Sequence, residues 1–183
     1  MAALHGMTEW TMQLRSGCVD DTLAIGRAIG SVLVAGDVLS LVGCLGAGKT
    51  HLVKGIAAGL GVPGDREVNS PTFVLLNEYE GRLHICHLDA YRVGDVAAFL
   101  DLGFDEMCDG QNVVVVEWGD RVRGAFGETT LWIELQVNGD TERRVVLGSR
   151  APSQPLVDRI NLAGLDEWVD GASPARGRTP SEG

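Results

Sequence analysis

The sequence predicts a single three-layer α/β domain, with a mainly parallel central sheet that antiparallel hairpins extend. An apolar run at 38–43 stops at glycine, and a glycine-rich loop and a helical pattern at 52–60 follow it. Four consecutive valines at 113–116 are typical of a central strand that is buried on both faces. Asn138-Gly139-Asp140 lies between two strand-like runs and is a strong hairpin signal. These three observations together predict an α/β fold.

The remaining elements follow from local patterns. The predicted elements are a strand near 9–14, a helix from Asp20 to about 35, a hairpin of 73–79 and 83–88, short helical pieces at 95–109, a hairpin of 131–137 and 143–147, and an amphipathic helix at 156–169. The stretch GASPARGRTPSEG at the end has no apolar residue larger than alanine, so we expect it to be disordered. The predicted organisation is a core domain at 1–150, followed at 151–183 by a C-terminal helix and a disordered tail.

Composition excludes several classes of protein. In the 183 residues, 15 Lys and Arg stand against 25 Asp and Glu, for a net charge of -10. That balance disfavours a surface that binds nucleic acid through phosphate neutralisation alone. The four cysteines form no C-x-x-C pair, and their spacing fits neither a compact zinc site nor a secreted disulfide scaffold. With no signal peptide or apolar run of about 20 residues, we expect a cytoplasmic protein that does not enter a membrane.

Residues 43–50, GCLGAGKT, match the phosphate-binding pattern G-x-x-x-x-G-K-[ST], and a strand precedes them and a helix follows, as that pattern requires. Glycines let successive backbone N–H groups converge on phosphate oxygens, and the helix N-terminus adds partial positive charge. Lys49 is expected to reach the β- and γ-phosphates, and the Thr50 hydroxyl to ligate Mg²⁺. The alternative is an accidental glycine turn. The predicted ligand is ATP or ADP with Mg²⁺, bound by Gly46, Ala47, Gly48, Lys49, Thr50 and His51.

Two acidic residues each end an apolar run: Asp89 follows 83–88, and Glu117 follows the valines. Strands often surface at charged residues, which is a purely structural explanation. Because a doubly wound sheet gathers the carboxyl ends of its parallel strands at one edge, both acids are expected beside the phosphate loop. We predict that Glu117 joins Thr50 as a metal ligand and that Asp89 orients or activates water. The predicted catalytic residues are therefore Lys49, Asp89 and Glu117.

Two further features have both a functional and a structural interpretation. His87 is either a ligand or base, or a packed and hydrogen-bonded strand residue, which is the more common situation of a lone histidine. Ser70-Pro71-Thr72 is a stiffened stretch placed where nucleotide-sensing loops occur in P-loop proteins. Ordinary turn chemistry explains the same residues equally well. Ser70 and Thr72 are the candidate residues of a switch-like loop.

Four motifs in this order resemble the bacterial TsaE family, the small ATPases needed to make threonylcarbamoyl-adenosine in tRNA. They are LxGxLGAGKT at 41–50, SPTF at 70–73, HxDxYR at 87–92 and the pair Glu117-Trp118. The resemblance covers roughly 10–148 and implies a P-loop NTPase fold. It also implies an ATPase that engages TsaB and TsaD partners and resets or drives their modification cycle, with tRNA contacted only indirectly.

The resemblance also implies roles for individual residues. It assigns Lys49 to phosphate binding, Thr50 and Glu117 to Mg²⁺, Asp89 to catalysis or support of the metal, Ser70 and Thr72 to the switch-like loop, and Tyr91 and Arg92 to the same edge. The sequence departs from the family pattern at two positions, since Cys44 stands where the family usually has Asp and His51 where it has Thr. A missing carboxylate at position 44 would alter water placement and turnover.

Two other functions compete with this interpretation. A small-molecule kinase shares the strand, the phosphate loop and the size, and Arg121 and Arg123 are candidate lid arginines. Against it, the C-terminal third has hairpin rather than helical-lid patterning. The other alternative is a nucleotide-dependent binding module with negligible turnover, which the departure at Cys44 mildly favours.

Overall fold

The computed structural model describes residues 4, 9–64 and 68–169. Its strands are β1 (Trp10–Ser16), β2 (Val38–Val42), β3 (Leu76–Glu80), β4 (His84–Asp89), β5 (Val113–Glu117), β6 (Leu131–Val137) and β7 (Arg143–Ser149). Its helices are α1 (Val19–Val32), α2 (Lys49–Gly59), α3 (Val96–Leu100), α4 (Phe104–Met107) and α5 (Gln154–Asn161), with short 3₁₀ helices η1 (Gly119–Ala125) and η2 (Asp166–Trp168).

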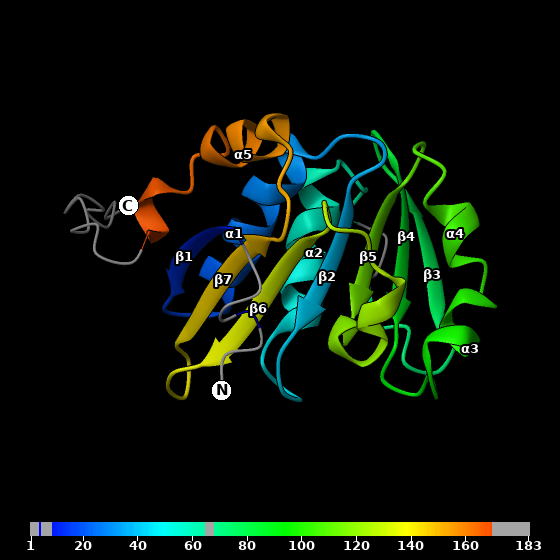
Figure 1. The fold of residues 1–183 in the computed structure, drawn as a ribbon. Coiled ribbons are helices and arrows are strands. Elements are labelled where there is room, and N and C mark those ends of the chain that lie inside the picture. Colours follow the sequence, from blue (N-terminus) through cyan, green and yellow to red (C-terminus); the bar gives the residue numbers. More distant parts are fainter. Residues whose placement is uncertain (1–3, 5–8, 65–67, 170–183) are drawn as a thin grey trace.

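All seven strands form one mixed sheet in the order β1-β7-β6-β2-β5-β4-β3 (Figure 1). The four central strands β6, β2, β5 and β4 are parallel to one another. Antiparallel pairing adds β3 at one edge and β7 and β1 at the other. The predicted mainly parallel core with antiparallel extensions is therefore confirmed. Because the central strands are parallel, the segments that follow β2, β4 and β5 leave the sheet at the same edge.

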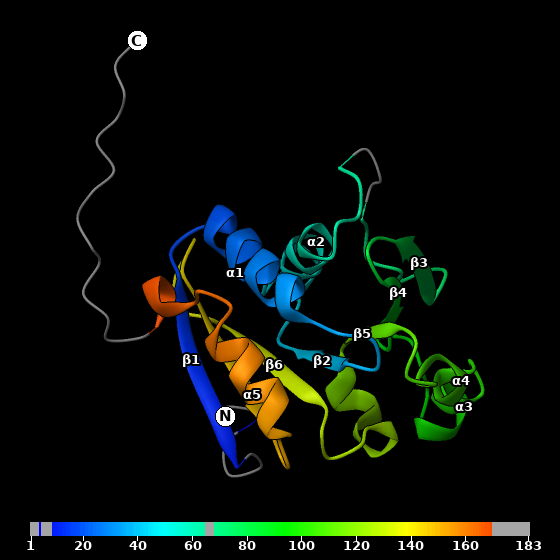
Figure 2. The same ribbon diagram turned by 90° about the horizontal axis from the view of Figure 1, so that it is seen from above.

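The two faces of the sheet are covered by different helices (Figure 2). One apolar cluster joins α1 and α2 to alternate strand residues such as Val113 and Val115. A second cluster, on the opposite face, joins α3 and α4 to Val114 and Val116. Each of these four valines is fully buried, as a central strand requires. The pure β-branched run thus predicted the place of β5 correctly, beside β2.

Close packing of α1 against α2 fixes the helix that begins at the phosphate loop. A Cβ atom added at Gly30 would collide with the backbone carbonyl of Ile56, and one added at Gly55 would collide with that of Leu23. Only glycine lets the two backbones approach this closely. The helix that carries Lys49 and Thr50 is therefore held rigidly against its neighbour and the sheet.

Two predicted elements differ from the structure. Residues 73–75, predicted as the start of a strand, form a turn in which the N–H groups of Val74 and Leu75 both donate to the carbonyl of Pro71. Leu75 has a left-handed backbone with φ of 68°, so β3 begins only at Leu76. The helix predicted at 156–169 is instead α5 and η2, because Gly164 interrupts it with φ of +71°.

Other boundaries are close to the predicted ones, and the hairpins β3–β4 and β6–β7 are confirmed. Leu156 and Ile160 of α5 pack into the same apolar cluster as α1 and α2. The segment 171–183, predicted to be disordered, lies outside the described residues. Across the described part of the chain, no helix has the length and apolar character needed to cross a membrane.

Candidate functional site

The loop after β2 has the backbone form that its glycines allow. Gly43 has φ of +148°, and a Cβ atom there would lie 2.6 Å from the carbonyl oxygen of Leu135. Gly48 has φ of +105° and is the N-cap of α2, so no side chain stands over the N–H groups of the first helical turn. Open space surrounds Gly46 where a Cβ atom would be. The loop is thus a cradle of backbone groups at a helix N-terminus, where anions bind.

Lys49 folds back over this loop. Its Nζ atom donates to the carbonyl oxygens of Gly43, at 2.8 Å, and Cys44, at 3.0 Å. The same atom lies 3.5 Å from the centre of the Trp118 ring, in a cation–π contact. Burial lowers the pKa of Lys49, while the carboxylate of Glu117 opposes that change. Among the described residues, this buried ammonium contacts two carbonyls and a ring, and an anion would be a stronger partner than either.

Thr50 and Glu117 meet between α2 and the end of β5. The Thr50 hydroxyl donates to both carboxylate oxygens of Glu117, at 3.1 and 3.3 Å. Glu117 is 2% exposed, and His87 Nε2 lies 3.1 Å from its Oε1 atom. A hydroxyl and a carboxylate are the oxygen ligands that Mg²⁺ prefers, so this pair fits a magnesium ion. His87 is the packed and hydrogen-bonded residue that the structural interpretation described, and it orients the predicted metal ligand.

Asp89 holds the segment that precedes β3. Its Oδ2 atom accepts hydrogen bonds from the hydroxyls of Ser70, at 2.8 Å, and Thr72, at 2.7 Å. Its Oδ1 atom accepts the backbone N–H of Tyr91 at 2.8 Å. A carboxylate has about four acceptor positions, so one remains for water or another donor. The predicted switch-like residues are therefore tied directly to the predicted catalytic acid, which sits in register with Glu117 on the neighbouring strand.

Aromatic and cationic side chains cover the same edge. The Tyr91 and Trp118 rings lie 4.9 Å apart between centroids. The Arg92 guanidinium lies 4.5 Å from the centre of the Phe73 ring. Phe73 itself is 82% exposed, as is Leu45 of the phosphate loop at 81%. Tyr91 and Arg92 thus belong to this edge, as the resemblance implies.

The structure brings most of the predicted site residues together. At the carboxyl ends of β2, β5 and β4, the structure gathers the loop at 43–50 with Lys49 and Thr50, and the acids Glu117 and Asp89. His51 is exposed on the first turn of α2. Arg121 and Arg123 lie in η1, where they face the rings of Tyr91 and Trp132 at 5.7 and 5.1 Å.

Sequence reasoning missed two contacts at this site. Trp118 was noted only within the Glu117-Trp118 pair, yet its left-handed backbone, with φ of 60°, places its ring under Lys49. Arg143, from the start of β7, donates from Nε to the carbonyl of Ala47 at 3.0 Å and so braces the loop. Arg143 directly follows a hairpin turn, and nothing at that position in a single sequence indicates a contact with the loop.

Three features define a P-loop-type α/β protein. They are a glycine loop after a central parallel strand, a lysine and a threonine at the start of the next helix, and an acid at the end of the neighbouring strand. Comparison with known proteins gives the family. A family model described as "Threonylcarbamoyl adenosine biosynthesis protein TsaE" matches residues 17–145. The chain belongs to the TsaE family.

Similar proteins are found in several bacteria. The chain is 42% identical to the tRNA threonylcarbamoyladenosine biosynthesis protein TsaE of Treponema pallidum over 136 residues, which are 74% of this chain and 99% of that protein. It is also 42% identical to the protein of the same name from Bacillus subtilis, over 69% of this chain and 78% of the relative. The crystal structure of Bacillus subtilis YdiB superimposes with a TM-score of 0.71 and 32% identity, covering 84% of this chain and 95% of that one.

Proposed function

We propose that this chain is a Mg²⁺-dependent ATPase with a three-layer P-loop NTPase fold, and that it serves threonylcarbamoyladenosine modification of tRNA. The observation that carries the proposal is the contact of Thr50 with Glu117 directly beside the glycine cradle. This contact supports the proposal, because a hydroxyl and a carboxylate are oxygen ligands that suit Mg²⁺ and they stand next to a glycine loop that the buried Lys49 faces. Membership in the TsaE family supports the biological role.

Each residue has a stated task in this proposal. Backbone N–H groups of 46–51 would bind the phosphates, and Lys49 would exchange the two loop carbonyls for phosphate oxygens. Thr50 and Glu117 would hold Mg²⁺, which would supply charge neutralisation at the phosphoryl group. Asp89 uses its remaining acceptor position to orient or activate the attacking water. Because Ser70 and Thr72 bond to Asp89, the state of the switch-like loop is coupled to the catalytic acid.

TsaB and TsaD are the proposed partners, with tRNA contacted only through them. The net charge of -10 supports a subunit that meets proteins rather than RNA. Three apolar side chains are exposed near the candidate site: Leu45 in the loop after β2, and Phe73 and Val74 in the turn before β3. Such side chains beside a nucleotide site favour a protein partner that senses the bound nucleotide. We propose the cytoplasm as the site of action.

Calorimetric titration with ATP and Mg²⁺ tests the site. Lys49→Ala should weaken ATP binding by about 10- to 150-fold, since a charge-assisted hydrogen bond contributes roughly 1.5–3 kcal/mol. Lys54→Ala is the matched control, because Lys54 is the other lysine of the chain and lies on the same helix. Equal ATP affinity in both variants would contradict the assignment.

Hydrolysis assays with and without TsaB and TsaD separate the alternatives. Turnover that rises when the partners are added supports the proposal. Phosphate transfer to a small molecule without partners would identify a kinase, and tight ATP binding without turnover under either condition would identify a binding module.

A further inference from the structure

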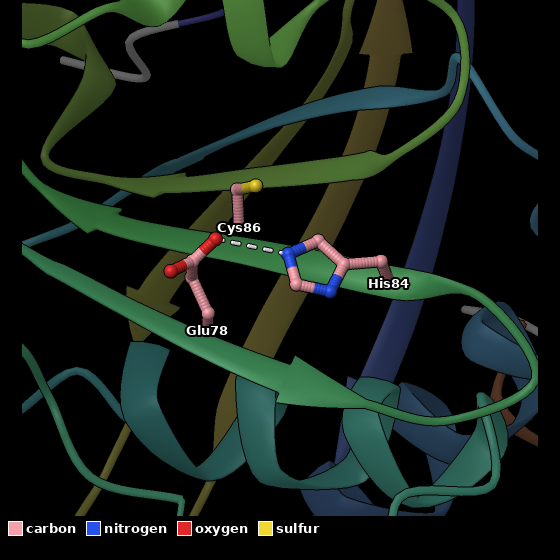
Figure 3. Close-up of side chains that lie close together, drawn as sticks. All are labelled: Glu78, His84 and Cys86. Carbon is pink, nitrogen blue, oxygen red and sulfur yellow. Dashed lines mark hydrogen bonds and ion pairs between the residues drawn. The ribbon is translucent and has the colours of Figure 1, made fainter.

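At the opposite end of β4 from Asp89, three different metal-ligating side chains converge on one face of the β3–β4 hairpin (Figure 3). Glu78 of β3 is the direct cross-strand partner of Cys86 on β4, and His84 lies two residues before Cys86 on the same face. The carboxylate oxygen, imidazole nitrogen and thiol sulfur of these residues all lie within 4.8 Å of one another. The sheet register itself therefore assembles the cluster.

The histidine is held in the orientation that a metal ligand needs. Its Nδ1 atom lies 2.8 Å from Glu80 Oε1, and its Nε2 atom lies 3.0 Å from Glu78 Oε1. When Nδ1–H donates to Glu80, Nε2 is left to face Glu78 and Cys86. A carboxylate behind the non-ligating nitrogen is the usual support of a metal-bound histidine, because it fixes the tautomer and the ring direction.

The charge around the cluster favours a cation. Two glutamates share one imidazole, and in the described part of the chain His84 is the sole ion-pair partner of both. The two carboxylates face the imidazole from both of its nitrogen atoms, so their negative charge is directed at the place that a cation would take.

We propose that Glu78, His84 and Cys86 form a Zn²⁺ site, with Glu80 as its positioning residue and one coordination position open to water. Sulfur, nitrogen and oxygen ligands together suit zinc better than Mg²⁺ or Ca²⁺, which take oxygen ligands. A tetrahedral zinc ion places its donor atoms about 3.5 Å apart. The three donor atoms, all within 4.8 Å of one another, lie near that spacing.

Proton balance follows from the state of the free ligands. Burial raises the pKa of the Cys86 thiol to about 11, with the Glu78 carboxylate adding to the rise. Zinc therefore displaces the thiol proton, and also the Nε2 proton of any charged His84, and both protons leave to the buffer. The cysteine spacing in the sequence could not indicate such a site, because it uses a single cysteine.

Titration of the full, nucleotide-free chain with Co²⁺ tests the site, since a cobalt–thiolate bond gives a charge-transfer absorption band. The wild-type chain should show this band at one Co²⁺ per chain, and equimolar Zn²⁺ should abolish it. C86S should lose the band. H84A and E78Q should bind at least 10-fold more weakly, and E80Q should lose about 10- to 100-fold in affinity, as supporting carboxylates do.

Matched variants keep the test decisive. C44S removes the exposed thiol of the phosphate loop. C108S removes a cysteine that packs against the α3–α4 apolar cluster, to which Cys86 also belongs. Both should retain the band, as should E117Q at the proposed magnesium site. Loss of the band in C44S instead of C86S, or an unchanged affinity in both H84A and E78Q, would overturn the proposal. H84A and E78Q alter half-buried or exposed positions, so they serve even if C86S fails to fold. The ATPase proposal is independent of all these outcomes.

Discussion

The two ends of β4 hold two histidines in contrasting surroundings. His87, near the carboxyl end, has a fully buried side chain and contacts Glu117, whose side chain is 3% exposed. His84, at the amino end, is 30% exposed and lies between Glu78 and Glu80, which are 58% and 69% exposed. Both histidines contact carboxylates at about 3 Å, yet only the first pair lies beyond the reach of water.

This contrast shows how burial changes what similar side chains do. Where water is excluded, a lost partner leaves a polar group unsatisfied, so the contacts among His87, Glu117 and Thr50 maintain one geometry. Where water is present, it replaces a lost partner, and the side chains can rearrange around an added ion. Strand β4 thus contributes to two kinds of cluster. The buried contacts at its carboxyl end are held in one arrangement, and the exposed side chains at its amino end can rearrange.

The largest expected effect distinguishes the two acids at the buried end. Asp89→Ala should lower single-turnover ATP hydrolysis by about 10²–10⁴-fold and spare ATP binding, because a group used in the transition state adds little to ground-state affinity. Glu117→Ala should instead weaken Mg²⁺-dependent ATP binding. Nucleotide titrations at several Mg²⁺ concentrations, beside single-turnover assays, measure both.

Asp140→Ala is the control for these variants, because Asp140 is exposed in the β6–β7 turn. If Asp89→Ala loses Mg²⁺ dependence and Glu117→Ala keeps it, the two roles are reversed. If neither change affects hydrolysis in the presence of the partners, the proposed catalytic site is wrong.

The next effect compares the histidines directly by stability. His87→Ala should lower the free energy of unfolding by about 2–4 kcal/mol, since it opens a cavity and removes a partner of buried Glu117. His84→Ala should cost less than about 1 kcal/mol, as exposed ion pairs usually do. Urea denaturation with EDTA and without nucleotide measures both. If both variants lost the same unfolding free energy, burial would not explain the difference between the two ends of β4.

The smallest effect concerns access to thiols. Bound nucleotide should slow iodoacetamide labelling of Cys44 several-fold, because phosphates would cover the loop that exposes it. Cys108 is the control, since it packs against the α3–α4 cluster on the face of the sheet opposite α2, and its rate should not change with nucleotide. Peptide mass spectrometry after timed labelling measures each cysteine.

The pKa of Cys108 adds an internal reference to that experiment. Burial, and then the Asp105 carboxylate, raise this pKa to about 11, so at pH 8 roughly one Cys108 thiol in 1,000 is ionised. Its labelling should be slow and should accelerate as the pH rises toward 11. Protection of Cys108 by ATP, or no protection of Cys44, would contradict nucleotide binding at the loop.

Local patterns were sufficient to predict much of the fold and several of the residues that meet at the candidate site. The valine run placed β5 inside the sheet, and the turn at 138–140 gave the β6–β7 hairpin. The motif at 43–50 predicted the strand, loop and helix around Lys49. The two failures concern segments that a turn or a glycine interrupts. The turn at 73–75 contains residues with strand propensity, but the N–H groups of Val74 and Leu75 bond to the carbonyl of Pro71 in the same segment. Gly164 divides the helix predicted at 156–169.

By itself the sequence determined which residues could carry the chemistry, because glycine torsions, strand periodicity and the character of each side chain are local properties. Only the tertiary structure decided which of them meet. Strand order brings Glu117 to Thr50, and the pairing of β3 with β4 brings Glu78 to Cys86. The same order packs His87 out of water and leaves His84 at the surface. Burial and contacts between distant residues depend on the whole sheet, and no stretch of one sequence encodes them alone.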